Sequence, residues 1–345
     1  MASADGFRVA LTGDFLTPDG RVGWGDIGLA ALDRAEPITY QFLPDHGPEL
    51  QPGSLSGYDA AIVLTTRVSR TSLHGAERLR ALARFGVGYD NVDLAACTEA
   101  GIVVTITPDG VRRPVAVSAL TLLLALAHRV RQKDQLVRTR RWADKLDHMG
   151  IGITGRTVGL IGWGNIGQEF SRLAAPLECR QIAHDPYADP RAAAAAAVEL
   201  VDLDTLMARA DFVVVACALT PQTDHLVDAG RLARMQPTAF LVNVSRGPVV
   251  DQRALTEALA ARRIAGAALD VFEQEPPDPD DPLLALDNVL LSPHAICWTD
   301  ELARGNGRSA ITAVLDVAAG RRPAHPVNPA AFDHPRWRSL EGAAP

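Results

Sequence analysis

Cysteine and long apolar runs are scarce in this chain of 345 residues. The four cysteines form no CxxC pair and have no histidine neighbour at the spacing of metal ligands, so we expect reduced thiols, mostly in the core, and no metal site. These cysteines are Cys97, Cys179, Cys217 and Cys297. The longest apolar stretch, residues 115–127, is interrupted by Ser118 and Thr121 and falls short of the roughly 18 residues of a membrane span. We therefore expect a buried helix there and no membrane partner.

Positive charge is also in deficit, with 34 Lys and Arg against 41 Asp and Glu and a net charge of −7. The one basic cluster, residues 138–141 followed by Trp142, is more typical of a solvated or interface segment than of a nucleic-acid site, so no nucleic-acid partner is expected. The first residues show no basic segment followed by an apolar core, which favours a cytoplasmic protein. A hydrophobic fraction of 47% and a length sufficient for two domains indicate an ordinary globular chain.

Short apolar runs alternate with helical patterns along the whole chain, which predicts an α/β fold. Residues 8–12 and 60–64 are expected strands, and residues 75–83 an expected helix, of a first and smaller unit. Later apolar runs predict a parallel sheet covered on both faces, and the alanine run 192–197 and residues 251–261 supply crossover helices. These later runs are 211–215, 239–243, 265–271 and 289–291. The proline-rich acidic segment 276–282 is an expected surface loop.

The most specific motif is Gly162-Trp163-Gly164-Asn165-Ile166-Gly167, which follows an apolar run. In a dinucleotide site, Gly162 makes the tight turn, Gly164 admits the pyrophosphate to the backbone, and Gly167 packs the helix against its strand. Asn165 and Ile166 then open a helix whose N-terminus faces the pyrophosphate. Asp185, 18 residues beyond Gly167, is placed to accept hydrogen bonds from the ribose hydroxyls and to repel a 2′-phosphate. The pattern predicts NAD as the cofactor, in preference to NADP.

Arg246, Glu275 and His294 each follow a predicted strand of this second unit. Ligands of open α/β sheets bind beyond the carboxyl ends of the strands, so the three side chains are expected in one crevice. Arginine binds a carboxylate and polarises a carbonyl, while a histidine whose protonated form a carboxylate stabilises can supply a proton. Asp270, at another strand end, either reaches the nicotinamide or caps a turn. Taken alone, each residue also has a simpler interpretation: Arg246 as a partner in a surface ion pair, Glu275 as a solvated loop acid, and His294 as a histidine bonded to the backbone.

The segments together resemble the D-isomer-specific 2-hydroxyacid dehydrogenases. The resemblance rests on the glycine loop, on residues 243–251 around Arg246, on 267–276 around Glu275, on Ser292-Pro293-His294, and on the upstream loop 84–93. It implies two Rossmann-like or flavodoxin-like domains with doubly wound parallel sheets, the nucleotide domain being inserted in the substrate domain. The implied boundaries are residues 1–114 and 300–345 for the substrate domain and 115–299 for the NAD domain.

The same resemblance implies roles for individual residues. Arg246 binds and polarises the substrate, His294 is the acid and base, Glu275 pairs with His294, and backbone amides near Val87 and Gly88 hold the substrate carboxylate. It also implies a homodimer paired through the nucleotide domains and the arm 142–155. Trp298 and Val117 stand where the family pattern differs. Trp298 either walls the substrate pocket and favours a small substrate or is an apolar interface residue.

The expected activity is NAD-dependent interconversion of a small 2-keto acid and its D-2-hydroxy acid, with glyoxylate or hydroxypyruvate as favoured substrates. Phosphoglycerate is a less favoured alternative, because many phosphoglycerate members append a regulatory domain after the dehydrogenase core. An unusual reductant such as formate or phosphite, and an NAD-sensing protein resembling the corepressors built on this fold, are further alternatives. Appreciable catalytic turnover would distinguish the enzyme hypotheses from the corepressor hypothesis.

Overall fold

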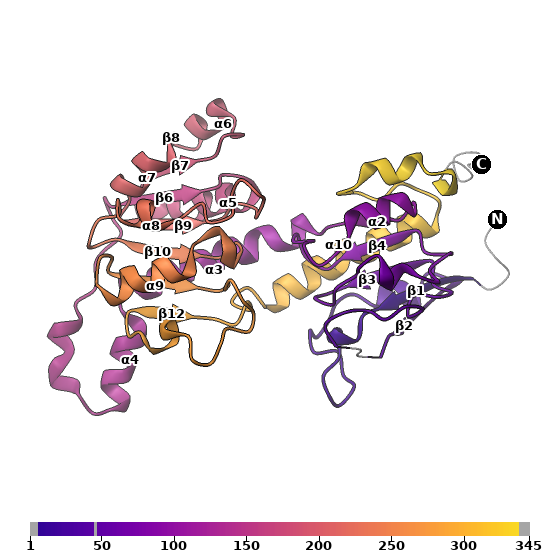
Figure 1. Cartoon of the computed structure of the whole chain (residues 1–345), viewed down its shortest axis with the longest axis horizontal. Coiled ribbons are helices and arrows are strands. Elements are labelled where there is room, and N and C mark those ends of the chain that lie inside the picture. Colours follow the sequence, from indigo (N-terminus) through magenta and orange to yellow (C-terminus); the bar gives the residue numbers. More distant parts are fainter. Residues whose placement is uncertain (1–5, 45–46, 338–345) are drawn as a thin grey trace. The chain divides into compact units, whose positions relative to one another are not determined.

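A computed structural model describes residues 6–44 and 47–337 of the chain. The chain divides into two compact units, each with its own parallel sheet (Figure 1). Unit 1 comprises Met1–Val111 and Trp298–Pro345, and unit 2 comprises Arg112–Cys297. In sequence, therefore, unit 2 is inserted into unit 1.

The sheet of unit 1 has five strands in the order β2-β1-β3-β4-β5, and all neighbouring pairs are parallel. The strands are β1 (Phe7–Leu11), β2 (Ile38–Phe42), β3 (Ala60–Val63), β4 (Ala81–Arg84) and β5 (Val103–Thr105). The helices are α1 (Ala30–Asp33), α2 (Leu94–Glu99) and α10 (Asp300–Ala318), with short 3₁₀ helices at Gly13–Phe15, Thr71–Leu73 and Pro329–Asp333. Leu11 and Ile62 pack against α10, whereas Ala10 and Val63 face the opposite core cluster, which contains Cys97. Side chains of alternate residues thus fill both faces of the sheet.

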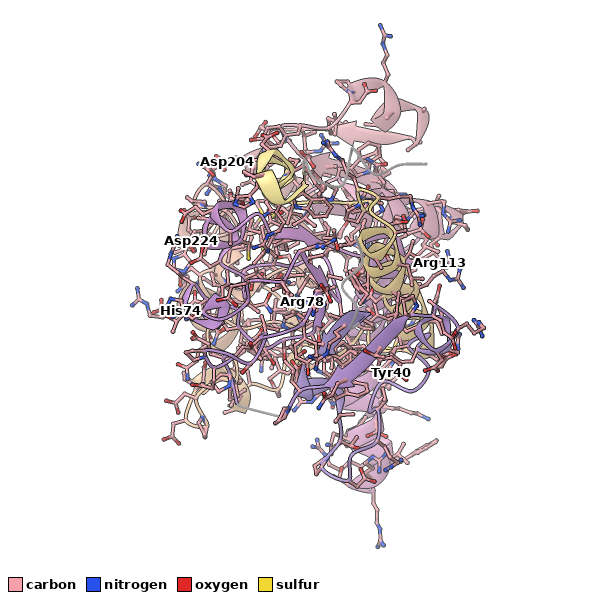
Figure 2. The ribbon with its side chains drawn as sticks, turned by 90° about the vertical axis from the view of Figure 1, so that its right-hand side faces the viewer. Tyr40, His74, Arg78, Arg113, Asp204 and Asp224 are labelled. Carbon is pink, nitrogen blue, oxygen red and sulfur yellow. The ribbon has the colours of Figure 1, made fainter. Side chains whose placement is uncertain are left out.

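The helix predicted for residues 75–83 is wrong, because the end of this segment is strand β4. β4 lies between β3 and β5, so Leu82 and its neighbours are buried on both faces. A short apolar run of that kind has no alternation, and periodicity alone cannot distinguish it from a buried helix. Just before β4, Arg78 pairs with buried Asp59 at 2.7 Å, an ion pair that fixes the extended segment; Figure 2 labels Arg78, as well as Tyr40 on the edge strand β2.

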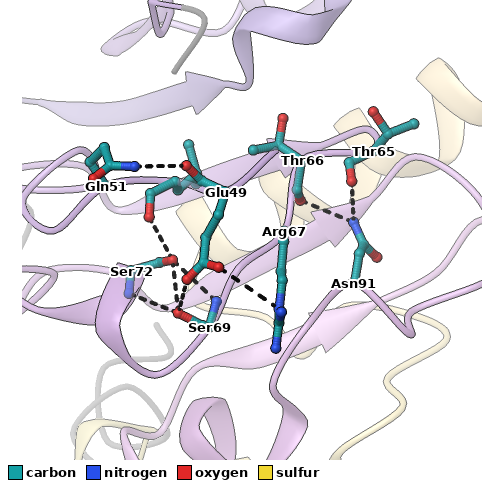
Figure 3. A network of polar contacts seen from close by, with 9 residues as sticks. Glu49, Gln51, Thr65, Thr66, Arg67, Ser69, Ser72 and Asn91 are labelled. Atoms are coloured by element: carbon teal, nitrogen blue, oxygen red, sulfur yellow. Dashed lines mark hydrogen bonds and ion pairs between the residues drawn. The ribbon is translucent and has the colours of Figure 1, made fainter. Parts of the chain in front are cut away.

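A polar network holds the loops that follow β3 and β4 (Figure 3). Asn91 Nδ2 donates hydrogen bonds to the carbonyl oxygens of Thr65 (3.3 Å) and Thr66 (3.1 Å). Farther along, Ser69 Oγ donates to Glu49 Oε1 at 2.5 Å. The loop after β4 is thereby tied to the segment after β3, at the carboxyl edge of the sheet.

The sheet of unit 2 has seven parallel strands in the order β12-β11-β10-β9-β6-β7-β8. The strands are β6 (Thr157–Ile161), β7 (Arg180–His184), β8 (Val198–Leu200), β9 (Phe212–Val215), β10 (Phe240–Asn243), β11 (Gly266–Leu269) and β12 (Val289–Leu291). The helices are α3 (Pro108–Ala127), which begins in unit 1, α4 (Val130–Arg138), α5 (Asn165–Ala174), α6 (Pro190–Ala195), α7 (Leu203–Arg209), α8 (Ala229–Leu232) and α9 (Gln252–Ala260). The 3₁₀ helices lie at Trp142–His148, Ala175–Leu177, Gly247–Val249 and Pro282–Ala285.

Helices cover both faces of this sheet. Val213 and Val215 of β9 pack in the core cluster of α7, α8 and α9, whereas Phe212 and Val214 pack in the cluster of α3 and α5. Both sheets are therefore doubly wound, and the predicted α/β class is confirmed. The four later strands lie where the apolar runs predict them, and residues 192–197 and 251–261 lie mostly in α6 and α9.

α3 is long and apolar enough, by length and composition alone, to cross a membrane. Its apolar side chains have another role, because Ala116, Ala119 and Leu123 are fully buried in the core of unit 2. The helix begins earlier than predicted, at Pro108, a residue type that the first turn of a helix tolerates well. All four cysteine thiols are free; Cys97 is fully buried and the other three are half-buried.

Candidate functional site

The three glycines of the loop after β6 meet three different steric demands. Gly162 has φ +94°, and a Cβ there would lie 2.7 Å from the amide nitrogen of Cys217. A Cβ at Gly167 would lie 2.4 Å from the carbonyl oxygen of Gly162, so helix α5 could not approach the loop as closely. A Cβ at Gly164, by contrast, would meet no atom of the described residues within 4 Å other than those of its neighbours in the chain. The fold itself thus requires Gly162 and Gly167, whereas Gly164 leaves open space beside the backbone.

This loop lies at the point where the strand order of the sheet reverses. β6 is flanked by β7 on one side and β9 on the other, and ligands of doubly wound sheets bind at the carboxyl edge of such a pair. α5 begins at Asn165 after the N-cap residue Gly164, and Ile166 follows in its first turn, which carries no acidic side chain. The open space at Gly164 and the unopposed positive end of the helix dipole suit the pyrophosphate of a dinucleotide.

Asp185 follows β7 at the same edge and is held by two backbone amides. Its Oδ2 accepts from Trp163 N at 2.8 Å and its Oδ1 from Tyr187 N at 2.9 Å. Each carboxylate oxygen keeps a second lone pair, so the group is oriented and still able to accept hydrogen bonds from ribose hydroxyls.

Trp163 anchors the glycine loop in the core, a role that the motif did not predict. The side chain is buried, and its Nε1 donates to Ser171 Oγ of α5 at 3.0 Å. Gln168 Nε2 donates back to the Trp163 carbonyl oxygen at 3.1 Å. Because the motif leaves this position open, only the packing of α5 identifies the tryptophan as an anchor.

His294 and Glu275 form a direct pair beyond the carboxyl ends of β12 and β11. His294 Nδ1 lies 2.8 Å from Glu275 Oε2, and Glu275 Oε1 accepts from Phe272 N at 3.0 Å. Burial raises the pKa of Glu275, but the hydrogen bond and charge of His294, the Phe272 amide and the charge of Arg246 outweigh it, so the pKa lies below its ordinary value. Glu275 is therefore an anion at neutral pH. Because His294 Nδ1 is engaged, Nε2 is the ring nitrogen left to exchange a proton.

Arg246 follows β10, and the backbone next to it packs against the loop that carries Glu275. Asn243 Nδ2 donates to the Arg246 carbonyl oxygen at 3.0 Å. At the adjacent Gly247 a Cβ would lie 1.9 Å from the carbonyl carbon and oxygen of Phe272. The two loops therefore contact each other backbone to backbone, and this contact brings the charge of Arg246 near enough to lower the pKa of Glu275.

Asp270 is buried at the end of β11 and holds the loop that carries His294. Its Oδ1 accepts from Ala295 N at 2.9 Å and from Ile296 N at 3.0 Å. His294 itself has a left-handed backbone, with φ +54°, which a residue with a Cβ rarely adopts without such support. These contacts match the turn-capping alternative for Asp270, and its contact with the nicotinamide stays a prediction.

A second histidine–glutamate pair supports the loop of Glu275, and no sequence motif indicates it. His225 Nε2 lies 2.9 Å from Glu273 Oε1, which also accepts from Gln252 N at 3.0 Å. Gln252 Oε1 in turn accepts from Glu273 N at 3.0 Å. Because 48 residues separate the histidine from the glutamate, only the fold brings them together.

The remaining predicted substrate residues lie in unit 1. Val87 and Gly88 follow β4, and in the described part of the chain neither backbone amide donates to a protein acceptor. Trp298 is half-exposed and packs on Trp24 with ring centroids 4.4 Å apart. Trp24 in turn packs on Phe85, with ring centroids 5.3 Å apart. An aromatic row thus runs from Trp298 to the residue that opens the loop of Val87 and Gly88.

Known proteins match both the sequence and the fold. The D-3-phosphoglycerate dehydrogenase of Archaeoglobus fulgidus is 38% identical over 272 residues, which cover 79% of this chain and 51% of the relative. A glyoxylate reductase of Korarchaeum cryptofilum is 39% identical over 269 residues, covering 77% of this chain and 81% of the relative. The apo-structure of the Escherichia coli D-lactate dehydrogenase superposes with a TM-score of 0.79 at 26% identity and covers 93% of this chain and 100% of that one.

The chain spans about half the length of the D-3-phosphoglycerate dehydrogenases that it matches and about four-fifths of the glyoxylate reductase. Residues 120–295 match the model of the NAD binding domain of the D-isomer specific 2-hydroxyacid dehydrogenases. This match confirms NAD as the predicted cofactor class, and the family resemblance is confirmed with it. The chain belongs to the D-isomer-specific 2-hydroxyacid dehydrogenase family.

Proposed function

We propose that this protein interconverts a small 2-keto acid and its D-2-hydroxy acid, with NAD as the redox partner. The observation that carries the proposal is the 2.8 Å contact between His294 Nδ1 and Glu275 Oε2, placed with Arg246 at the carboxyl edge of the NAD binding domain. A cation beside a protonatable histidine suits a ketone that becomes an alkoxide and takes up a proton.

In the reductive direction, bound NADH supplies the hydride that reduces the keto carbon. Arg246 binds the substrate and polarises its carbonyl, so that negative charge can develop on the oxygen. His294 donates its Nε2 proton to that oxygen, and the ionised Glu275 stabilises the imidazolium beforehand. In the oxidative direction neutral His294 removes the hydroxyl proton. The free amides of Val87 and Gly88 bind the substrate carboxylate in this proposal.

Glyoxylate and hydroxypyruvate are the favoured substrates. The aromatic row of Trp298, Trp24 and Phe85 suits a small substituent on the keto acid, because bulky rings occupy space beside the loop of Val87. A relative named glyoxylate reductase is matched over most of its length. Phosphoglycerate stays the alternative substrate, because a D-3-phosphoglycerate dehydrogenase is about as similar in sequence identity as the glyoxylate reductase.

A substrate panel tests the proposal. NADH oxidation is followed optically with glyoxylate, hydroxypyruvate, pyruvate and 3-phosphohydroxypyruvate, with NADPH in parallel. We expect the largest kcat/KM with glyoxylate or hydroxypyruvate and NADH. Preference for the phosphorylated acid would replace the substrate assignment, and tight NADH binding without turnover on any acid would overturn the proposed activity.

We further propose that the protein acts as a homodimer in the cytoplasm. α4 and the following 3₁₀ helix expose several large apolar side chains, which cost free energy when they face water. Trp142, Leu146 and Met149 are 66%, 74% and 67% exposed. A second copy of the chain, covering this arm, accounts for an apolar surface on an otherwise polar segment.

A further inference from the structure

Glu275 lies in a segment that has little packing of its own. Phe272, just after β11, is buried, and the next buried residue along the chain is Leu283, whereas residues 273–276 are exposed. An exposed loop of this kind samples many conformations unless hydrogen bonds restrain it. Polar contacts must therefore hold the Glu275 carboxylate within 2.8 Å of His294 Nδ1.

Glu273, two residues before Glu275, is the point at which this segment is held. Its Oε1 accepts from His225 Nε2 at 2.9 Å and from Gln252 N at 3.0 Å. Its own N donates to Gln252 Oε1 at 3.0 Å. Because the carboxylate oxygen is the acceptor, His225 Nε2 carries the proton of the first of these bonds. The side chain of a distant histidine thus restrains the loop of Glu275.

The backbone of His225 is attached to the loop of Arg246. Its N donates to the carbonyl oxygen of Pro248 at 2.7 Å. With φ +48°, the residue has a left-handed backbone, which is uncommon for a residue with a Cβ and is concentrated at functional sites. His225 therefore joins the loop of Arg246, through its backbone, to the loop of Glu275, through its side chain.

This histidine–glutamate pair adds little to the stability of the fold. The side chains of His225 and Glu273 are 51% and 34% exposed, and exposed pairs of opposite charge contribute little to the free energy of unfolding. A role in stability alone would thus leave the strained backbone of His225 and its two attachments without a function. A role in geometry needs only that the bond keeps Glu273 in place.

We propose that His225 is a positioning residue, which through Glu273 holds Glu275 in the orientation that contacts His294. This role rests on the proposed function, in which Glu275 stabilises the imidazolium of His294. His225 itself exchanges no proton with the substrate. Its effect on the reaction passes through Glu275, so it should disappear when the Glu275 carboxylate is removed.

A double-mutant cycle on kcat for reduction of the preferred keto acid tests this dependence. His225→Ala removes the side chain and keeps the backbone N that donates to Pro248. We expect kcat to fall about ten- to a hundredfold, because a small displacement of Glu275 is enough to disturb proton transfer. The Kd for NADH and the melting temperature should not change. In Glu275→Ala, which has no carboxylate to position, the further change His225→Ala should alter kcat less than about twofold.

Two further variants separate the hydrogen bond from a general effect of losing a histidine. His225→Gln should recover most of kcat, because the Gln amide nitrogen can donate to Glu273 as Nε2 does. His74→Ala, which removes an exposed histidine of unit 1, is the matched control and should leave kcat unchanged. The inference is overturned if His225→Ala keeps full kcat, if its loss is undiminished in Glu275→Ala, or if His225→Gln is as impaired as His225→Ala.

Amide hydrogen exchange at Phe272 tests the inference without turnover. Phe272 N donates to Glu275 Oε1 at 3.0 Å, so its exchange rate reports on the position of that carboxylate. We expect exchange to be about tenfold faster or more in His225→Ala and unchanged in His225→Gln and His74→Ala. If the unmodified protein turns over no acid, the proposed function fails and this measurement alone decides. Equal exchange in His225→Ala and the unmodified protein would show that His225 does not position Glu275.

Discussion

Gly164 is the glycine of the loop that the proposed cofactor site requires and that the packing of the protein does not. Apart from its neighbours in the chain, no atom of residues 6–44 and 47–337 lies within 4 Å of the place where its Cβ would be, so Gly164→Ala should fold with an unchanged melting temperature. The added methyl group should nevertheless occupy the space of the pyrophosphate and weaken NADH binding at least about tenfold. Fluorescence titration with NADH measures this loss. Gly167→Ala is the contrasting variant, because its Cβ would collide with the Gly162 carbonyl oxygen and lower stability.

A second prediction concerns Asp185 and the choice between NADH and NADPH. Removal of its oriented carboxylate in Asp185→Ala should take away both an acceptor for the ribose hydroxyls and the repulsion of a 2′-phosphate. The ratio of kcat/KM for NADH to that for NADPH should fall about tenfold or more, the equivalent of about 1.4 kcal/mol. Asp189→Ala, four residues along, controls for the general loss of negative charge. An unchanged ratio in Asp185→Ala would remove the residue from cofactor selection.

At the scale of helices, Glu169 joins α5 to α3. It bonds Arg172 of its own helix at 2.7 Å and Arg113 of α3 at 2.9 Å. The hydrogen bonds from Arg172, and then from Arg113, outweigh desolvation and lower the pKa of Glu169 to about 2, from an ordinary value of 4.5. Its stabilising effect is therefore present above about pH 4.5 and is lost as the pH falls towards 2.

Glu169→Gln should accordingly lower the free energy of unfolding by about 1 kcal/mol at neutral pH. The difference from the unmodified protein should shrink as the pH falls from about 5 to about 3, because the carboxylate of the unfolded chain takes up its proton first. Urea unfolding at each pH measures it. A difference that stays constant with pH would show that packing, and not charge, gives Glu169 its effect.

Strands β9, β10, β11 and β12 of unit 2 could be predicted from the sequence because buried parallel strands are short, nearly continuous apolar runs. The same reasoning is wrong at β4, because its residues and those just before it are mostly strong helix formers, and burial between β3 and β5 overrides that propensity. Arg246, Glu275 and His294 could be placed at one sheet edge from strand ends alone. The contacts that hold the loops at this edge could not be predicted, because they join segments that are distant in the sequence. Examples are the pair of His225 with Glu273 and the hydrogen bond that Asp270 accepts from Ala295 N.

At the scale of the whole molecule, the exposed apolar side chains of the arm 142–155 favour a homodimer. Trp142 and Leu146 expose large apolar surfaces that a second subunit would bury. The double variant Trp142→Glu, Leu146→Glu should therefore shift the protein from dimer to monomer in light scattering coupled to size-exclusion chromatography. Tyr187→Glu is the matched control, because this side chain is 95% exposed and lies outside the arm. A monomer before any substitution would contradict the proposed homodimer.

In the proposed reaction, each turnover depends on one proton at His294. The most direct test is kcat for NADH-dependent reduction of the preferred keto acid by His294→Gln, with the Kd for NADH measured on the same sample. We predict that kcat falls by about 10²- to 10⁴-fold while the Kd for NADH stays the same within error, because the side chain serves proton transfer and the glycine loop serves the cofactor. Retention of most of the activity, with intact cofactor binding, would contradict the assignment of His294 as the acid and base.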